Sequence, residues 1–185
     1  MKKSIFGIRE VVAAGIGTAL FVALTEVQIP IGFIPNTSLQ VRAALLAFFS
    51  AVYGPVVGGI VGLLGHALGD AFFSGSVWWS WVFPDAFFGI AMGLFAKKFA
   101  IREGGFGRSQ KILFNVVQVI ANVIAFAVLA PLLDIAIYSE PANKVFTQGL
   151  FAVVGNVLIV AILGTLICVA YAKMMGKSSG LKKED

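Results

Sequence analysis

The chain has 185 residues, of which 59% are hydrophobic and 12% are charged, and its formal net charge is +5. A typical globular domain carries about 25% charged residues, so this chain has too little polar surface to cover a water-facing sphere. Six membrane-crossing helices of about 20 residues each would use most of its length. The composition therefore predicts a membrane protein and argues against a cytosolic, secreted or nucleic-acid-binding one.

Apolar stretches predict six transmembrane helices, at residues 11–24, 39–52, 55–73, 79–96, 112–133 and 145–174. The basic start resembles a signal peptide, but no small-residue cleavage site follows, so we interpret the first stretch as a retained helix. The longest connections are the Pro-, Gly- and Asn-containing loop 29–38, the basic loop 97–111 and residues 134–144. We therefore expect one all-α integral membrane domain, residues 1–185, built as a single bundle of six helices.

The basic residues indicate how this bundle is oriented. Of the 14 Lys and Arg residues, 12 precede the first helix, lie in loop 97–111 or close the chain, whereas Arg42 and Lys144 fall on the opposite side. By the positive-inside rule, the N- and C-termini are cytoplasmic. A five-helix alternative, with 39–52 re-entrant, would break this asymmetry.

Two residue types limit the chemistry. Cys168 and His66 are the only cysteine and histidine. They cannot supply the four ligands of a usual structural zinc site. We predict no metal, no cofactor and no internal disulfide, and we expect Cys168 to pack as a small apolar side chain.

Polar residues gather in the outer halves of the predicted helices. His66 and Asp70 lie four residues apart on one helix face, and Asp85 lies on the next helix. A charge within the hydrocarbon costs about 2.5–3.5 kcal/mol, so such groups usually face protein or a wet cavity. With Arg42 they predict a pocket open to the outside, and Trp79 and Trp81 add aromatic surface for a small planar ligand.

Structural roles for these residues stay open. Trp78 is more typical of the interfacial aromatic belt, and Trp79 and Trp81 could belong to it as well. His66 could join helices by a hydrogen bond, and Asp70 could form a structural ion pair with Arg42. Interhelical hydrogen bonds are an equal alternative for two amides, Asn122 and Asn156.

Small residues form stripes that let helices approach closely in lipid. In the third predicted helix, Gly58 and Gly62 favour packing inside the bundle. In the first helix, Gly15, Ala19 and Ala23 recur at every fourth position. This stripe could pack against an external partner helix or inside the bundle, and its spacing alone does not distinguish the two.

Three stretches carry a resemblance to a known family: IPNTSLQVRAALLAF (34–48), YGPVVGGIVGLLGHALGD (53–70) and WWSWV (78–82). They resemble the substrate-binding S components of energy-coupling factor (ECF) vitamin transporters, riboflavin-type or hydroxymethylpyrimidine-type. The resemblance implies a multi-pass protein of the bacterial cytoplasmic membrane that is not an enzyme. It implies a transmembrane coupling (T) subunit and two cytoplasmic ATPase subunits as partners, with no nucleic acid.

The resemblance also implies which residues act. The helix 1 stripe of Gly15, Ala19 and Ala23 would contact the coupling subunit, and loop 29–38 would close over the ligand. The expected substrate-binding residues are Asn36, Gln40, Arg42, His66, Asp70, Trp79, Trp81, Asp85, Asn122, Gln148 and Asn156. We expect a small heteroaromatic vitamin or precursor, with hydroxymethylpyrimidine ahead of pyridoxine-type compounds and riboflavin.

Two other functions remain as alternatives. An autonomous secondary transporter or channel for a small polar solute would need a polar path through the inner halves of the helices, which are apolar in this sequence. An intramembrane Ser/His enzyme would need an oxyanion hole, for which the sequence around Ser76 and Ser80 gives no support.

Overall fold

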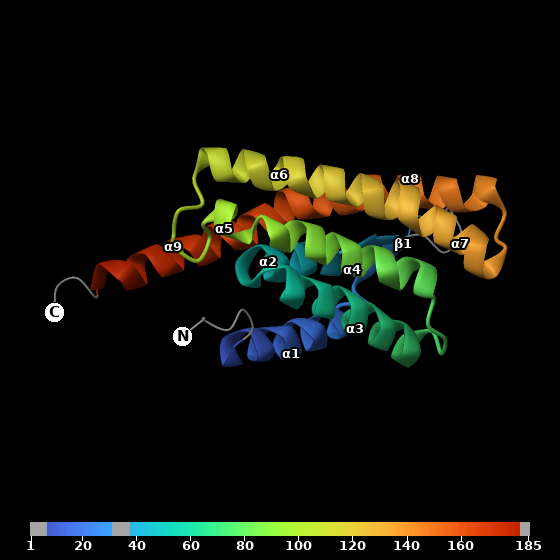
Figure 1. Ribbon diagram of the computed structural model, residues 1–185, viewed down its shortest axis with the longest axis horizontal. Helices are drawn as coiled ribbons and strands as arrows, with labels where there is room; N and C mark the ends of the chain where they lie inside the picture. The colour runs from blue at the N-terminus through green and yellow to red at the C-terminus, as the bar shows by residue number, and fades with distance from the viewer. Residues whose placement is uncertain (1–6, 31–37, 182–185) are drawn as a thin grey trace.

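The computed structural model of the protein describes residues 7–30 and 38–181. Within them, six long helical segments run roughly along one axis (Figure 1). The first four are α1 (Ile8–Ala23), α2 (Arg42–Tyr53), α3 (Pro55–Phe73) and α4 (Trp79–Leu94), and a short α5 (Ala96–Phe99) follows. The fifth segment joins α6 (Arg108–Asn122), η1 (Val123–Leu129) and α7 (Ala130–Tyr138), and the sixth joins α8 (Ala142–Ile159), η2 (Val160–Gly164) and α9 (Thr165–Leu181).

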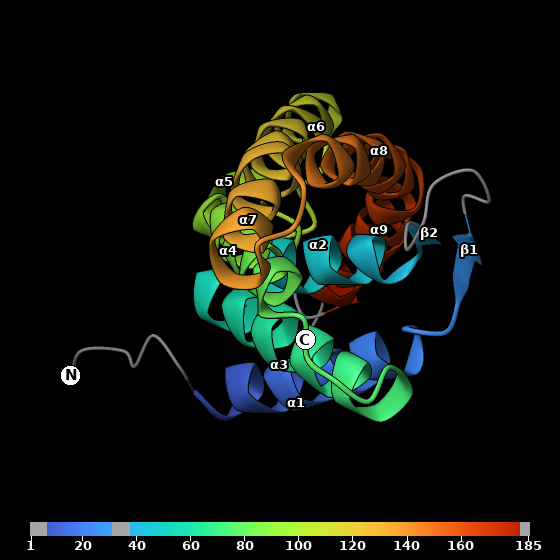
Figure 2. The ribbon, with the colours of Figure 1, turned by 90° about the vertical axis from the view of Figure 1, so that its right-hand side faces the viewer.

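Helix α2 lies at the centre of the bundle. Viewed along the bundle, it is placed between the α1 and α3 helices on one side and α8 on the other (Figure 2). Leu46 and Ala47 are fully buried and Ala44 nearly so. At its end, Gly54 has φ +94, a conformation that side-chain-bearing residues rarely adopt, and Pro55 begins α3 directly.

The described residues at the two ends of the predicted loop 29–38 belong to a small antiparallel ribbon. Strands β1 (Gln28–Pro30) and β2 (Ser38–Gln40) pair with Gln28 opposite Gln40. Because residues 38–40 are held in β2, the second helix begins at Arg42 and not at the predicted residue 39. Residues 31–37, which include Asn36, lie outside the described residues.

The fifth helix is longer than predicted, and residues 134–144 are not a connection. The segment continues through η1, a π-helical stretch, to Tyr138, and only residues 139–141 separate it from α8. Pro131 has no N–H to donate, and the wider turns of η1 come immediately before it. The correction places Asp134 on α7, inside the bundle.

Glycines bring α3 and α4 into backbone contact, which confirms the internal packing predicted for the third helix. A Cβ at Gly58 would collide with the carbonyl of Gly89, and one at Gly89 with the carbonyl of Gly58. A Cβ at Gly62 would come within 2.5 Å of the Asp85 carbonyl oxygen. These two helices are therefore fixed together by backbone and not by side-chain interdigitation.

The small-residue stripe of α1 makes no such backbone contact with another described helix. Its opposite face, including Gly17 and Phe21, is buried against α2 and α3. Gly15, Ala19 and Ala23 are exposed, and a Cβ at Gly15 would meet no atom within 4 Å. Packing inside the bundle therefore does not account for this stripe.

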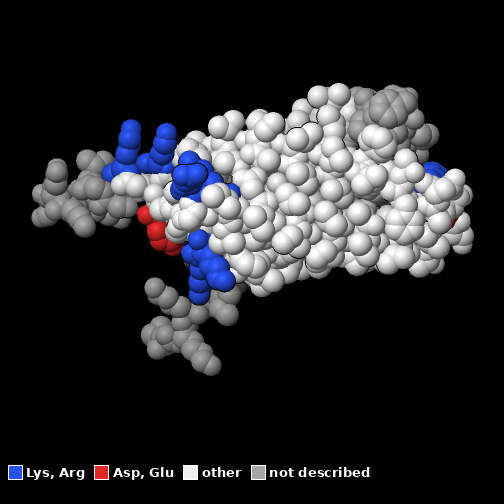
Figure 3. All heavy atoms as spheres, turned by 90° about the horizontal axis from the view of Figure 1, so that it is seen from above, with Lys and Arg blue, Asp and Glu red and all other residues white. Residues whose placement is uncertain are grey.

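Charge and hydropathy are polarised along the bundle. Three stretches are long and apolar enough to cross a membrane: Pro55–Phe73, Arg108–Tyr138 and Ala142–Lys177. Helices α1, α2 and α4 are shorter, with 16, 12 and 16 residues. On the face shown in Figure 3, Lys and Arg gather at one end, and the long middle is free of charged side chains.

We call the end that carries α5, the start of α6 and the end of α9 the basic end. The start of α1 lies there too (Figure 1). This placement agrees with termini on one side of a membrane. The six crossings and the cytoplasmic side of the termini stay predictions.

Candidate functional site

A cavity of about 350 Å³ opens at the end of the bundle opposite the basic end. It lies between β2, α2, α3, α4, α7 and α8, and its size is within the range of small-molecule sites. Eight of the residues predicted to bind substrate line it: Gln40, Arg42, His66, Asp70, Trp81, Asp85, Gln148 and Asn156.

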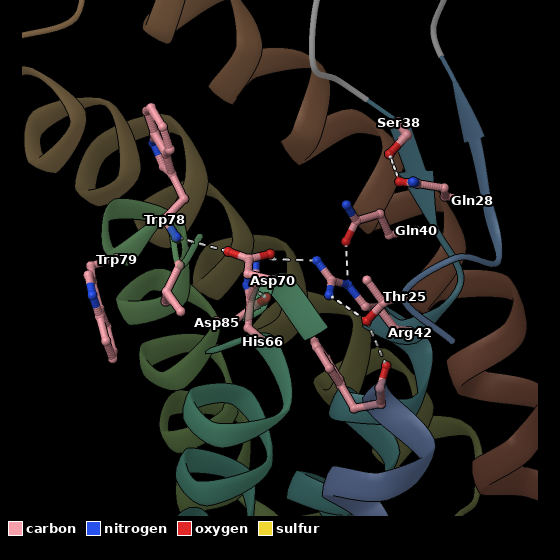
Figure 4. A network of polar contacts seen from close by, with 12 residues as sticks. Thr25, Gln28, Ser38, Gln40, Arg42, His66, Asp70, Trp78, Trp79 and Asp85 are labelled. Carbon is pink, nitrogen blue, oxygen red and sulfur yellow. Dashed lines mark hydrogen bonds and ion pairs between the residues drawn. The ribbon is translucent and has the colours of Figure 1, made fainter. Parts of the chain in front are cut away.

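Three predicted site residues are not brought into this cavity. Trp79 is exposed and packs on Phe83 with ring centroids 5.6 Å apart, and it points away from the polar network (Figure 4). Asn122 is buried, and its Nδ2 donates to the carbonyl and side-chain oxygens of Gln118 on its own helix. Asn36 lies outside the described residues.

Arg42 is the centre of the polar network on the cavity wall. It is 3% exposed and begins α2, immediately after β2. Its guanidinium donates to Gln40 Oε1 at 2.5 Å and to Thr25 Oγ1 at 3.1 Å. Its third nitrogen lies 3.3 Å from His66 Nε2. The ring of Phe21 lies beneath it, 4.8 Å from the guanidinium carbon. One cation thus ties the ribbon, α1 and α3 together.

His66 connects this cation to two carboxylates. Its Nδ1 lies 2.6 Å from Asp85 Oδ2, and its Nε2 lies 3.5 Å from Asp70 Oδ1. A guanidinium can only donate and a carboxylate can only accept. Nδ1 therefore donates to Asp85, whereas Nε2 accepts from Arg42 in a neutral ring or donates to Asp70 in a protonated one. The direct ion pair between Asp70 and Arg42 that we considered is therefore replaced by contacts through His66.

The network crosses the cavity wall from the ribbon to the start of α4 (Figure 4). At one end, Ser38 Oγ donates to Gln28 Oε1 across the two strands. At the other, Asp70 accepts from the backbone N–H of Trp78 at 3.0 Å. Burying any of these polar groups in an apolar bundle without a hydrogen-bond partner would cost free energy. Pairing them with one another therefore favours this arrangement of the ribbon, α2, α3 and α4.

Asp134 is a site residue that the sequence prediction missed. It is 2% exposed and accepts the indole Nε1–H of Trp78 at 2.7 Å and that of Trp81 at 2.8 Å. Ser80 Oγ also donates to it. The available signal was the apolar run that continues beyond it, through Ile135 to Ile137.

Trp78, which we expected in the aromatic belt, is a cavity residue that the site prediction left out. It lines the cavity, and its ring stacks on Tyr138 with centroids 4.3 Å apart. Trp81 lies deeper, with its ring centroid 6.2 Å from that of Phe126. Asp134 therefore orients two indoles from α4 on the cavity wall.

A charge pair lies at the α7–α8 connection. Lys144 Nζ contacts Glu140 Oε2 at 2.7 Å, four residues earlier in the chain, and both residues line the cavity. The Glu140 side chain is partly buried.

Comparison with known proteins places this geometry in a family. Residues 5–173 match the family model described as ECF-type riboflavin transporter, S component. A UPF0397 protein of Exiguobacterium sp. is 46% identical over 97% of this chain and 98% of its own length. UPF0397 proteins of Streptococcus gordonii and Lactobacillus helveticus are 48% identical (97% of this chain, 96% of theirs) and 47% identical (100% of both).

No solved structure gives a significant match to the chain. The family match covers nearly every described helix, from α1 into α9. The chain therefore belongs to the S-component family of ECF-type riboflavin transporters, whose members are components of a membrane transporter.

Proposed function

We propose that this chain is the substrate-capture subunit of an ECF-type importer. It binds a small heteroaromatic vitamin or precursor in the cavity, on the outer side of the membrane. It delivers this ligand inward after docking on a transmembrane coupling (T) subunit driven by two cytoplasmic ATPase subunits. The observation that carries the proposal is the cavity itself, in which two oriented indoles face hydrogen-bonding groups at the end away from the basic residues.

The lining suits a planar ring with polar substituents. Indole faces stack on heteroaromatic rings, while carboxylates and amides receive or donate hydrogen bonds at the ring edge. Asp85, Gln148 and Asn156 supply such groups from α4 and α8. A single-ring compound would fit in a cavity of about 350 Å³ and could form hydrogen bonds with these groups. Hydroxymethylpyrimidine is our first candidate, followed by pyridoxine-type compounds and riboflavin.

The exposed stripe of α1 supports docking. Gly15, Ala19 and Ala23 form a face of small residues, and no described part of the bundle covers it. Such a face permits close backbone approach to another helix in lipid. A coupling subunit packed there would be free to slide as the bundle reorients, because no side chain interlocks.

Tryptophan fluorescence of the detergent-purified protein tests substrate capture. We expect saturable quenching by one compound among hydroxymethylpyrimidine, pyridoxine, thiamine and riboflavin. Trp81→Phe should remove most of the signal and weaken binding, whereas Trp79→Phe, the matched control outside the cavity, should leave the affinity unchanged. Saturable binding that depends on Trp79 and not on Trp78 or Trp81 would contradict this location.

A further inference from the structure

The cavity carries an excess of negative charge. Its lining contains four carboxylates, Asp70, Asp85, Asp134 and Glu140, against two permanent cations, Arg42 and Lys144. His66 is neutral when its Nε2 accepts from Arg42 and cationic when Nε2 donates to Asp70. Four carboxylates less two cations leave two negative charges with a neutral His66 and one with a cationic His66.

Asp134 carries one negative charge of this excess. Lys144 forms an ion pair with Glu140. His66 contacts Asp70, Asp85 and Arg42, so these two carboxylates lie in a network that contains a cation. Asp134 has three donors, two indole N–H groups and one hydroxyl, all of them neutral. Among the described residues it forms no ion pair. Three donors on both oxygens are the arrangement that stabilises an ionised carboxylate, so this wall of the cavity keeps a buried anion without a counter-charge.

The same wall is aromatic. The two indoles that Asp134 holds line the cavity beside it. Indole faces attract cations through the ring quadrupole, and this attraction grows when the cation is desolvated. Aromatic faces and a carboxylate without a counter-charge both favour a cationic ligand over an anionic one.

We propose that the ligand of this cavity carries a positive charge on a nitrogen heterocycle, which binds between the indoles with Asp134 as its counter-ion. This inference rests on the proposed function, because it specifies the ligand of the same cavity. It distinguishes a cationic ring from a neutral ring of the same shape, such as an uncharged flavin or pyridine.

Two probes of equal shape test the charge. One is the N-methylpyridinium derivative of 3-deoxypyridoxine, which lacks the acidic ring hydroxyl and is therefore a permanent cation. The other is its benzene isostere, in which a carbon bearing the methyl group replaces the ring nitrogen. Both are titrated by tryptophan fluorescence against the full-length protein in detergent. We expect the cation to bind about tenfold more tightly, because one buried charge is satisfied only by that probe.

Three variants assign this preference to Asp134. Asp134→Asn should reduce the cation preference to about threefold or less by removing the charge. Ser80→Ala removes one donor from the same carboxylate and keeps its charge, so the preference should fall less than in Asp134→Asn. Lys144→Gln leaves Asp134 and its donors untouched and makes the lining more negative, so it should strengthen the preference even if Asp134→Asn fails to fold.

The outcomes separate this inference from the proposed function. Equal affinity for the two probes overturns the cationic ligand and leaves heteroaromatic capture standing. Binding of riboflavin or hydroxymethylpyrimidine without any binding of the pyridinium probe would likewise overturn the cationic ligand and leave heteroaromatic capture standing. A cation preference that Asp134→Asn retains overturns the role of Asp134. Failure of every heteroaromatic compound to bind overturns the proposed function as well.

Discussion

Arg42 shows how one residue organises a polar site inside an apolar bundle. Its planar guanidinium presents separate N–H groups to Gln40, Thr25 and His66, which belong to three different parts of the chain. Lysine would place all its donors on one atom at the end of a flexible stem. The geometry of the guanidinium, in addition to its charge, therefore connects the ribbon to α1 and α3.

Substituting this residue conservatively should be costly. Arg42→Lys loses at least one hydrogen bond from a charged donor, so we expect the free energy of unfolding to fall by about 2 kcal/mol. Thermal unfolding in detergent measures this effect. Arg108→Lys is the control, because Arg108 is exposed at the start of α6 and its replacement should change stability by less than about 0.5 kcal/mol. Equal midpoints for the two variants would argue against the network.

At the scale of elements, the contact between α3 and α4 depends on missing side chains. Gly89→Ala places a methyl group against the backbone carbonyl of Gly58, which cannot move aside as a side-chain end would. We expect a loss of about 1–3 kcal/mol, as for other overpacked sites. Gly15→Ala makes the same chemical change in open space within α1 and should maintain or raise the unfolding midpoint in detergent, because alanine has the higher helix propensity.

The exposed face of α1 carries a prediction about transport. Ala19→Leu should leave folding and ligand binding intact in detergent and abolish ligand uptake by cells that express the coupling module, because the added side chain blocks close helix approach. Ala136→Leu, an equally exposed position on α7, should retain uptake. Loss of binding in the Ala19 variant, or normal uptake, would exclude this face as the docking surface.

Elements also show where sequence reasoning succeeded and where it stopped. Apolar periodicity and the Tyr53-Gly54-Pro55 break located α2 and α3 because such signals are local. Asp134 was missed because a carboxylate in an apolar run looked like the end of a helix. Its partners, Trp78 and Trp81, are more than 50 residues away in sequence, and no local pattern reports such a contact.

The opposite error concerned Trp79, which shares its sequence neighbourhood with the two indoles of the cavity. One residue on a helix turns the side chain by about 100°. Trp81 and Trp79, two positions apart on α4, therefore lie on different faces, and only Trp81 lines the cavity. Trp78 precedes the helix, and its indole lines the cavity as well. The spacing was visible in the sequence, but which face meets the cavity depends on how α4 packs against α7.

At the scale of the whole molecule, the basic end and the cavity end are at opposite ends of the bundle. This polarity predicts that the cavity faces outward in a membrane that follows the positive-inside rule. Labelling of single cysteines in intact cells tests it, in a Cys168→Ala background that removes the buried native thiol.

Ser139→Cys, at the cavity end between α7 and α8, should react with an impermeant maleimide added outside. Ser109→Cys, at the basic end in the first turn of α6, should react only after the membrane is permeabilised. Reaction of both positions from outside, or the reverse order, would contradict the predicted orientation and with it the external mouth of the cavity.

The backbone contact between α3 and α4 bears on how ligand specificity changes in evolution. Because Gly58 and Gly89 hold α3 against α4 by backbone contact, this helix–helix contact is not made by the side chains of His66, Asp70 and Asp85. Substitutions on the cavity wall that keep Arg42 paired can then accumulate without moving α3 relative to α4. One scaffold is thus able to diverge toward new ligands while the surface of α1 stays the same.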